Sequence, residues 1–294
     1  MVAMEFISRG NSVNTVLSSV GLSKSVFYYH PSSGKRGGRP SSFTLTETGE
    51  RVSNEVVVHE IESLLSREFV DYGYIKIAHY LKQHTFLINK KKVYRLMKDK
   101  KLLLGKRITP APKRPFVQYR KISAEYPYQF LEMDIKYIYI HGEKRNVFLL
   151  TILDLFSRKA LGYTLKASVR KKDVISLFNA TIKACPNIHG ITVRNDNGSQ
   201  FIAYKVREHL FEHGFSQEFI HPGTPEEIGH IEALHSIIER EVVMKYEFEN
   251  FEELYSTLDR YFTFYNAERI HSSIGFTSPD KFLAEYYSRE ALHG

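Results

Sequence analysis

Residues 147–155 (VFLLTILDL) form an almost unbroken apolar run, and this feature restricts the fold more than any other in the chain. A strand of this composition is expected to be buried on both faces, so helices must cover both sides of its sheet. The preceding segment 130–140 alternates in polarity, and residues 157–165 follow after a short turn, which predicts three consecutive strands. The expected elements after them are a helix Lys172–Ala184, a strand 191–196, a helix Tyr204–His213, a short strand 217–222, and long helices Gly229–Tyr246 and Phe251–Asn266. This order predicts an α/β fold with a mixed five-stranded sheet flanked by helices.

The first 31 residues have a different pattern, typical of a small all-α region. An apolar stripe at helical spacing runs from Val13 to Val20, and Gly21 permits a tight turn after it. Ser23 can cap a short second helix, Lys24–Tyr29. The segment is predicted to be helix-turn-helix-like, with a plain helical hairpin as the alternative. A linker rich in Gly, Ser and Pro is predicted over residues 32–52.

Three further helices are predicted at Asn54–Arg67, Tyr74–His84 and Lys90–Lys101, and a concentrated positive charge begins at the third. Residues 89–121 contain 13 Lys and Arg and one acid, so their net charge is +12 in a chain of net charge +8. A basic stripe on a helix indicates a nucleic-acid contact, whereas a solvated basic linker is the alternative. The candidate DNA-binding residues here are Lys90, Lys91, Lys92, Arg95, Lys98, Lys106, Arg107, Lys113 and Arg114.

Three carboxylates lie at positions where a sheet enzyme could use them. Asp134 is in the middle of the strand 130–140, where an acid is unfavourable by propensity. Asp196 follows a short apolar strand, and sites in open α/β sheets form at the carboxyl ends of strands. Glu232 is near the start of a helix, off its apolar stripe. The alternative for Asp134 is a surface position on an edge strand, and for Asp196 it is a turn-forming Asp-Asn-Gly. For Glu232 it is an acid at a helix N-terminus, which the helix dipole favours.

The residue types favour hard divalent metals over zinc. Carboxylate oxygens suit Mg²⁺, and two ions about 3.5–4 Å apart can assist phosphoryl transfer. Cys185 is the only cysteine, which excludes a Cys-rich zinc site and an internal disulfide and favours a cytoplasmic protein. No apolar stretch approaches the length of a membrane span, and the first residues lack a signal-peptide pattern, so no membrane contact is expected.

Several motifs occur together along the chain. FLEMDIKYI contains Asp134, VRNDNGSQF contains Asp196 and GHIEALHSIIERE contains Glu232, with 35 residues between the last two acids. LDLFSRKALGY, YNAERIHSSIGFTSPDKF and the upstream DYGYIKIAHYL and INKKKVYRLMKDKKLL accompany them. From about Val57 to Phe282 the chain therefore resembles insertion-sequence transposases related to retroviral integrases. It resembles in particular the integrase-core, second-frame product of the insertion-sequence-three group.

This resemblance implies an RNase H-like catalytic core and a DDE transposase, a polynucleotidyl transferase. Asp134, Asp196 and Glu232 would bind two Mg²⁺ (or Mn²⁺) ions for 3′-end cleavage and strand transfer. Arg269 and His271 would contact DNA phosphate or brace the site. The partners would be double-stranded DNA (terminal inverted repeats and target), further copies of the chain, and an upstream-frame DNA-binding protein, in the bacterial nucleoid. The predicted segments are 1–31 (helix-turn-helix-like), 32–52 (linker), 53–104 (helical DNA-binding domain), 105–125 (basic linker), 126–286 (catalytic core) and 287–294 (tail).

The chain departs from the family pattern at three places. It has no Trp, although the family has one before the first acid, and it has Ile228 where the family has Asn. A basic residue seven positions after the glutamate is replaced by Glu239, so the neighbouring Arg240 becomes the candidate DNA contact. The alternative functions are a DNA-binding regulator or decayed copy without catalysis, and a nuclease that cleaves without joining. Asp154 and Arg158 are interpreted as a structural hairpin turn.

Overall fold

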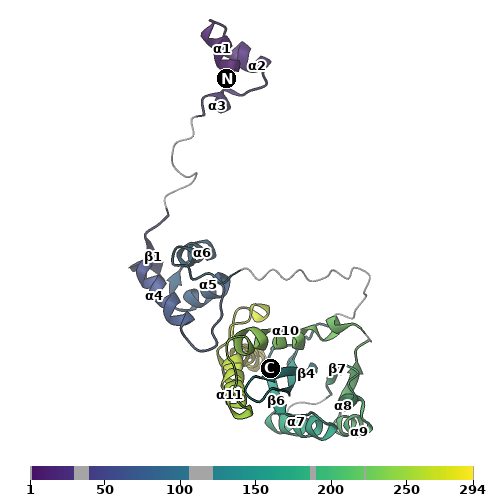
Figure 1. Cartoon of the computed structure of the whole chain (residues 1–294). Helices are drawn as coiled ribbons and strands as arrows, with labels where there is room; N and C mark the ends of the chain where they lie inside the picture. Colours follow the sequence, from purple (N-terminus) through teal and green to yellow (C-terminus); the bar gives the residue numbers. More distant parts are fainter. Residues whose placement is uncertain (1, 30–39, 106–121, 186–189, 222, 294) are drawn as a thin grey trace. The chain divides into compact units, whose positions relative to one another are not determined.

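The computed structural model describes residues 2–29, 40–105, 122–185, 190–221 and 223–293. The chain divides into two compact units, Met1–Ser42 and Phe43–Gly294 (Figure 1). Within the described ranges, none of the helices has the length and apolar character that crossing a membrane requires.

The first unit contains three short helices, α1 (Val2–Ser8), α2 (Val13–Ser19) and α3 (Lys24–Phe27). The Ser23 hydroxyl accepts a hydrogen bond from the Val26 N–H and so caps α3. Gly21 has a φ of 64°, which is the conformation that a tight turn between α2 and α3 requires. The two predicted helices are confirmed, and α1 was not predicted from the sequence.

The second unit begins with a small antiparallel sheet of strands β1 (Phe43–Thr46), β2 (Arg51–Ser53) and β3 (Phe86–Leu87), in the order β2-β1-β3. The prediction of a linker over 32–52 is therefore wrong from residue 43 onward. These strands have two to four residues, too few for an alternating pattern to be recognised in the sequence.

Helices α4 (Asn54–Leu65), α5 (Tyr74–Gln83) and α6 (Lys90–Asp99) confirm the three predicted helices. Side-chain caps define two of their starts, since Ser53 accepts from the Val56 N–H and Asn89 accepts from the Lys92 N–H. Apolar residues of all three helices form one core, whose fully buried members are Val57, Ile61, Ile77, Leu81, Val93 and Met97.

The larger sheet has five strands: β4 (Phe130–Ile140), β5 (Arg145–Asp154), β6 (Ala160–Lys166), β7 (Thr192–Asn195) and β8 (Ser216–Phe219). Their spatial order is β6-β5-β4-β7-β8. Strands β4, β5 and β6 pair antiparallel, whereas β7 is parallel to β4 and β8 is parallel to β7. The predicted mixed five-stranded sheet is confirmed, and this strand order is that of the RNase H-like fold.

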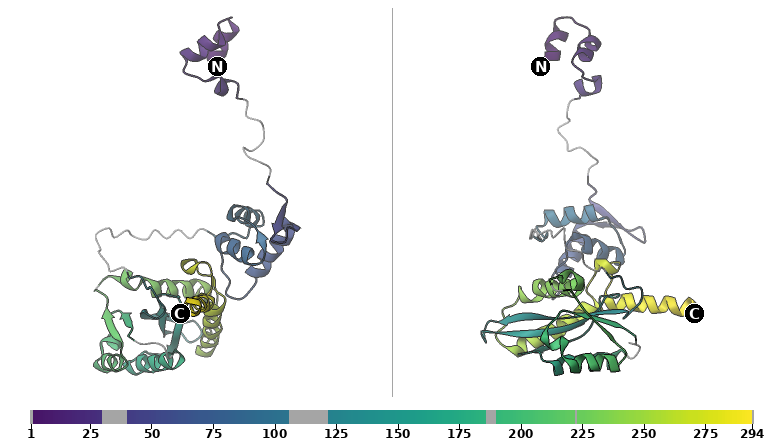
Figure 2. Two further views of the ribbon diagram at one scale, coloured as in Figure 1. Left: turned by 180° about the vertical axis from the view of Figure 1, so that it is seen from behind. Right: turned by 90° about the vertical axis from the view of Figure 1, so that its right-hand side faces the viewer.

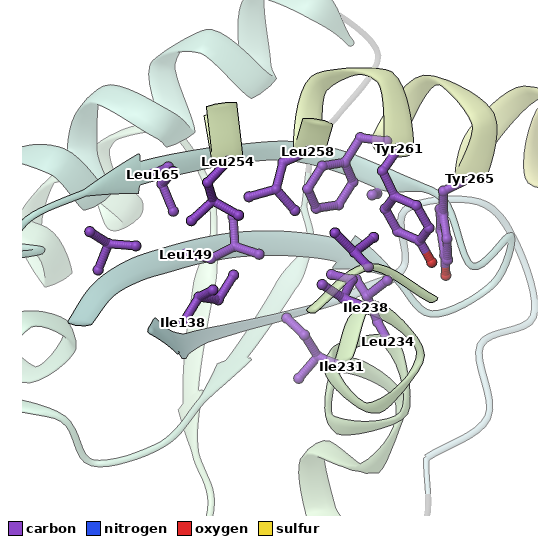
Figure 3. Close-up of a cluster of buried hydrophobic side chains, with 14 of the residues drawn as sticks. Ile138, Leu149, Leu165, Ile231, Leu234, Ile238, Leu254, Leu258, Tyr261 and Tyr265 are labelled. Carbon is purple, nitrogen blue, oxygen red and sulfur yellow. The ribbon is translucent and has the colours of Figure 1, made fainter. Parts of the chain in front are cut away.

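Helices cover both faces of the sheet, as the apolar run of β5 requires (Figures 1 and 2). One face packs against α7 (Lys171–Ala184), α8 (Ser199–Ile202) and α9 (Tyr204–Glu212). The other face packs against α10 (Gly229–Ile238) and α11 (Phe251–Ala267). Figure 3 shows Leu149 and Leu165 of the strands facing Leu254 and Leu258 of α11.

Two predictions about the C-terminal half need correction. The helix expected over Gly229–Tyr246 ends as an α-helix at Ile238 and continues as a π-helical segment, η2 (Glu239–Val243). The tail expected over 287–294 belongs largely to a helix, α12 (Pro279–His293). Two short 3₁₀ segments, η1 (Pro225–Ile228) and η3 (Ser272–Ile274), lead into α10 and α12.

Candidate active site

The pairing of β4 with β7 brings the first two candidate acids to adjacent strands. Met133 of β4 is in register with Asn195 of β7, and the strands are parallel. Asp134 and Asp196 are the next residues of the two strands, so both follow the same register position. The third acid, Glu232, is in the first turn of α10, which packs against the face of β4. All three carboxylates are half-buried.

The charges of the three acids oppose one another. Burial raises the pKa of Asp196 above its ordinary value, and the charge of Asp134 raises it further, although the Gly198 N–H donates to it at 3.0 Å. Burial also raises the pKa of Glu232, with Asp134 as the largest electrostatic contributor. Asp134 is thus the shared neighbour of both other acids, and the site is electrostatically unfavourable for three ionised carboxylates.

Two side chains from the helix of Glu232 reach the strand of Asp134. The Nδ1 of His235 is 3.4 Å from the Oδ2 of Asp134. One turn further on, Glu239 forms an ion pair of 2.8 Å with Lys136. These contacts hold the α10–η2 run against β4, on the helix face that Glu232 shares with His235 and Glu239.

The start of the glutamate helix is held by Glu132, a residue that the sequence analysis did not single out as functional. Its side chain is 1% exposed, accepts from the Ile231 N–H at 2.7 Å and lies 3.1 Å from the His230 Nδ1. An N-cap residue ordinarily accepts from this N–H, and Ile228 at that position cannot. The buried acid two residues before Asp134 therefore supplies the missing cap from the neighbouring strand. The signal in the sequence is an acid at an inward-facing strand position.

The donor set fits a divalent cation in its chemistry. Among the residues that the structure describes, no three His, Cys, Asp or Glu side chains are close enough together to hold a metal ion. The acids nevertheless offer only hard oxygen ligands, and their mutual repulsion is the charge distribution that a divalent cation neutralises. Asp134, Asp196 and Glu232 are the candidate ligands for such an ion.

Asp154 is a structural residue, as expected. Its carboxylate is fully buried and accepts from the backbone N–H groups of Tyr128, Phe156 and Ser157 and from the Ser157 hydroxyl. These bonds fix the turn between β5 and β6. Arg158, in the same turn, donates its N–H to the Asp154 carbonyl, but its Nη1 has no hydrogen-bond partner among the described residues.

The predicted DNA-binding residues of α6 separate into two groups. Lys90, Lys91 and Lys98 are exposed, so they are free to contact a polyanion. Lys92 instead donates to the carbonyl oxygen of Phe43 in β1, and Arg95 is half-buried. The candidates Lys106, Arg107, Lys113 and Arg114 lie outside the described residues.

The burial of Arg269 and His271 contradicts the prediction that they contact DNA, and the alternative that they brace the site stays a prediction. Arg269 is 2% exposed and donates from two nitrogens to the fully buried Glu241, at 2.7 and 2.8 Å. His271 is 6% exposed, and burial together with the charge of Arg269 lowers its pKa to about 2, so it is neutral. Arg240 is half-exposed, and it pairs with Asp71 at 3.0 Å and with Glu241.

Three family models match the sequence. Two models described as integrase core domain match residues 124–225 and 213–279, and one described as HTH-like domain matches residues 53–108. The integrase core matches correspond to the five-stranded sheet with its helices. The HTH-like match corresponds to the helices α4, α5 and α6.

Proteins of insertion elements are among the relatives of this chain. The transposase for insertion sequence element IS904 of Lactococcus lactis is 25% identical over 79% of this chain and 95% of its own length. An uncharacterized protein of insertion element IS476 of Xanthomonas euvesicatoria is 26% identical over 75% of this chain, which spans only 62% of that relative. The HTLV-2 integrase catalytic core domain, solved in complex with magnesium, aligns over 54% of this chain and 99% of its own, with 15% identity and a TM-score of 0.44. The chain therefore carries an integrase core domain behind an HTH-like domain, and its relatives include a transposase of an insertion sequence.

Proposed function

We propose that this protein is a DNA transposase that cleaves the 3′ ends of an insertion sequence and joins them to a new phosphodiester position. The observation that carries this proposal is the parallel register of β4 and β7, which makes Asp134 and Asp196 neighbours opposite the helix of Glu232. An integrase core domain with three mutually repelling carboxylates at this point suits metal-dependent phosphoryl transfer better than any other chemistry.

Each residue of the site has a separate task in this proposal. Asp134, Asp196 and Glu232 are the metal ligands, and a bound divalent ion supplies charge that stabilises the attacking and leaving oxygens. His235 orients the carboxylate of Asp134, and Glu132 fixes the first turn of α10 so that Glu232 keeps its position. These interactions preorganise the site before the DNA arrives.

DNA binding is assigned to the exposed lysines of α6 and to the basic segment that follows it. Lys90, Lys91 and Lys98 lie on the exposed face of a helix within the part matched by the HTH-like model. Binding through phosphate contacts predicts an affinity that falls steeply with salt, with each lysine lost reducing the salt dependence by about one unit of slope. Two DNA ends must be held together for joining, so we also propose that the protein acts as a homo-oligomer on DNA.

The test is a cleavage and joining assay with the purified chain, a labelled duplex that carries the element's terminal repeat, and Mg²⁺ or Mn²⁺. Glu232→Gln is expected to lose metal-dependent nicking and joining while it still binds DNA. Glu252→Gln is the matched control, because Glu252 is also an acid in the first turn of a core helix but is exposed on α11. DNA binding by the unaltered chain without strand chemistry would instead support the alternative of a DNA-binding regulator.

A further inference from the structure

The β5–β6 turn contains a half-buried arginine, Arg158, that forms no ion pair with an acid among the described residues. The Nη1 of Arg158 is inaccessible to solvent and has no hydrogen-bond partner among the described residues. The two fully buried arginines each have an acid, since Arg194 pairs with Glu218 and Arg269 pairs with Glu241, although the Nη2 of Arg194 also lacks a partner among the described residues. A buried donor without an acceptor costs free energy, and a charged one costs more.

The charge of Arg158 is only partly compensated by its surroundings. Burial lowers its pKa, and the attraction of Glu132 offsets this only in part. Both carboxylate oxygens of Glu132 are already engaged, one by the Ile231 N–H and one by His230. In Arg269 the balance is reversed, because the hydrogen bonds that it donates to Glu241, and the charge of Glu241, raise its pKa despite burial.

The backbone at Arg158 is also unfavourable for this residue. Its φ is 64°, in the left-handed region that favours glycine or asparagine. The turn itself is held by Asp154, whose carbonyl accepts from the Arg158 N–H at 3.0 Å, and by the contacts of the Asp154 carboxylate. A glycine would therefore serve the turn better, so the turn does not explain the arginine.

Arg158 lines a cavity of about 820 Å³, a size typical of small-molecule sites. One side of this cavity carries aromatic rings from the turn and from α12, where Phe156 lies 5.3 Å from Phe282 and 5.2 Å from Tyr286, centroid to centroid. His230 and the exposed Arg289 line it as well. An ion pair of 2.7 Å between Lys159 and Asp280 holds α12 in this position.

We propose that this cavity binds one unpaired nucleotide of a DNA strand, with its phosphate on Arg158 and its base against the ring of Tyr286. Arginine beside aromatic rings is the chemistry that holds single-stranded nucleic acid, because the guanidinium binds phosphate and every base can stack. His230 is two residues before Glu232 on the same helix, so the nucleotide would lie next to the bond that is cut. This inference rests on the proposed function, because it assumes that the substrate is DNA.

The test measures binding of a short single-stranded deoxyoligonucleotide that contains 2-aminopurine, by anisotropy and by quenching of the 2-aminopurine fluorescence. Arg158→Met is expected to weaken binding about tenfold, the equivalent of about 1.4 kcal/mol. Tyr286→Leu is expected to remove most of the quenching, because the leucine side chain cannot stack. Arg207→Met is the matched control, since Arg207 is an exposed arginine on α9, which packs on the other face of the sheet.

The variants also separate this inference from the proposed function. If Arg158→Met does not fold, Arg289→Met and Tyr286→Leu change only the rim of the cavity and still test it. If these variants bind the oligonucleotide and quench its fluorescence as well as Arg207→Met does, the nucleotide site is overturned. The transposase proposal would remain intact. Failure of the unaltered chain to bind a terminal-repeat duplex would count against the proposed function itself.

Discussion

Glu232 and Glu241 lie nine positions apart on one helical run, yet the protein treats their charges in opposite ways. Glu232 is half-buried, has no cationic partner among the described residues, and has a pKa raised by burial and by Asp134. Glu241 is fully buried, but hydrogen bonds from Arg269 and Tyr261 outweigh the effect of burial and lower its pKa. The charge of Glu232 is thus left uncompensated among the described residues, whereas the charge of Glu241 is compensated by Arg269.

The transition between the two environments coincides with a change of helix geometry. Glu232 is in the α-helical part and Glu241 is in the π-helical segment Glu239–Val243. A π-turn rotates the side chains that follow it, so it can direct Glu241 inward, toward Arg269, while α10 keeps Glu232 toward β4. The π-helical segment thus allows one helical run to place Glu232 in the candidate site and Glu241 in the buried ion pair with Arg269.

The largest expected effect comes from neutralising a carboxylate of the candidate active site. Asp196→Asn is expected to reduce strand cleavage by at least about 10²-fold, because the charge that attracts the metal is lost. It is also expected to raise the melting temperature of the metal-free protein at pH 7. A carboxyl whose pKa is raised by folding adds stability only at low pH, and this is lost as pH rises through the folded value.

Thermal unfolding measured from pH 4 to pH 7 without metal checks the stability part of this prediction. The amide variant should lose less stability over this range than the unaltered chain. A melting temperature that falls at pH 7 on substitution would show that Asp196 stabilises the fold, and the contrast with Glu241 would then disappear.

The second effect tests Glu241, the acid whose charge Arg269 compensates. Glu241→Gln removes the charge that compensates the buried Arg269, and loss of one partner of a buried ion pair costs about 3–5 kcal/mol. The free energy of unfolding, measured by urea titration, should fall by an amount in this range. Glu247→Gln is the control, because Glu247 is exposed in the turn that follows and surface changes are usually within about 0.5 kcal/mol.

Much of the catalytic half could be predicted from the sequence, because its signals are local. The alternation of 130–140 and the apolar run of 147–155 predict β4 and β5 within two residues of their observed ends. The acids could be proposed because each stands at an unusual place in such an element. Their mutual electrostatic effect could not be predicted, since it depends on the register of β4 with β7.

The predictions failed where long-range contacts decide the outcome. Arg269 has the composition of a DNA contact, but Glu241, 28 residues earlier, buries it. The strand β3 has two residues and exists because β1 pairs with it. The π-helical segment continues the helical pattern of the sequence, so one uninterrupted helix was predicted over Gly229–Tyr246. The parts outside the described residues, including Lys106 and Arg107, remain predictions.

The third effect tests how Glu232 is positioned. Glu132→Ala leaves the buried Ile231 N–H without its acceptor, which should lower the free energy of unfolding by about 1–3 kcal/mol. Because the first turn of α10 is then less fixed, cleavage should also fall at low temperature, where the variant is still folded. The loss of stability alone would not produce that fall. A second substitution, Ile228→Asn, restores an N-cap side chain for the same N–H and should recover part of both losses.

The outcome of the double variant decides between two roles of Glu132. Partial recovery of both stability and cleavage would show that Glu132 acts as a cap for the helix. Ile228 is 3% exposed in an apolar core, so Ile228→Asn alone is expected to destabilise the protein. If the double variant is no better than Glu132→Ala, the carboxylate contributes charge to the site rather than a cap.

The smallest effect concerns the ion pair of Lys136 with Glu239, whose side chains are 16% and 43% exposed. In charge compensation this pair is intermediate between Glu232 and Glu241. Such a pair contributes at most about 1 kcal/mol to stability.

Lys136 is two residues from Asp134 on the same face, about 7 Å along the strand, so it repels a cation held there. Lys136→Met should therefore lower the Mg²⁺ concentration that gives half-maximal cleavage severalfold, since the repulsion at this distance is about 1 kcal/mol in water. Glu239→Gln should raise that concentration, because it leaves Lys136 uncompensated. Equal Mg²⁺ dependence in both variants would mean that the metal ligands do not lie beside Lys136, and that the assignment of Asp134 to the metal needs to change.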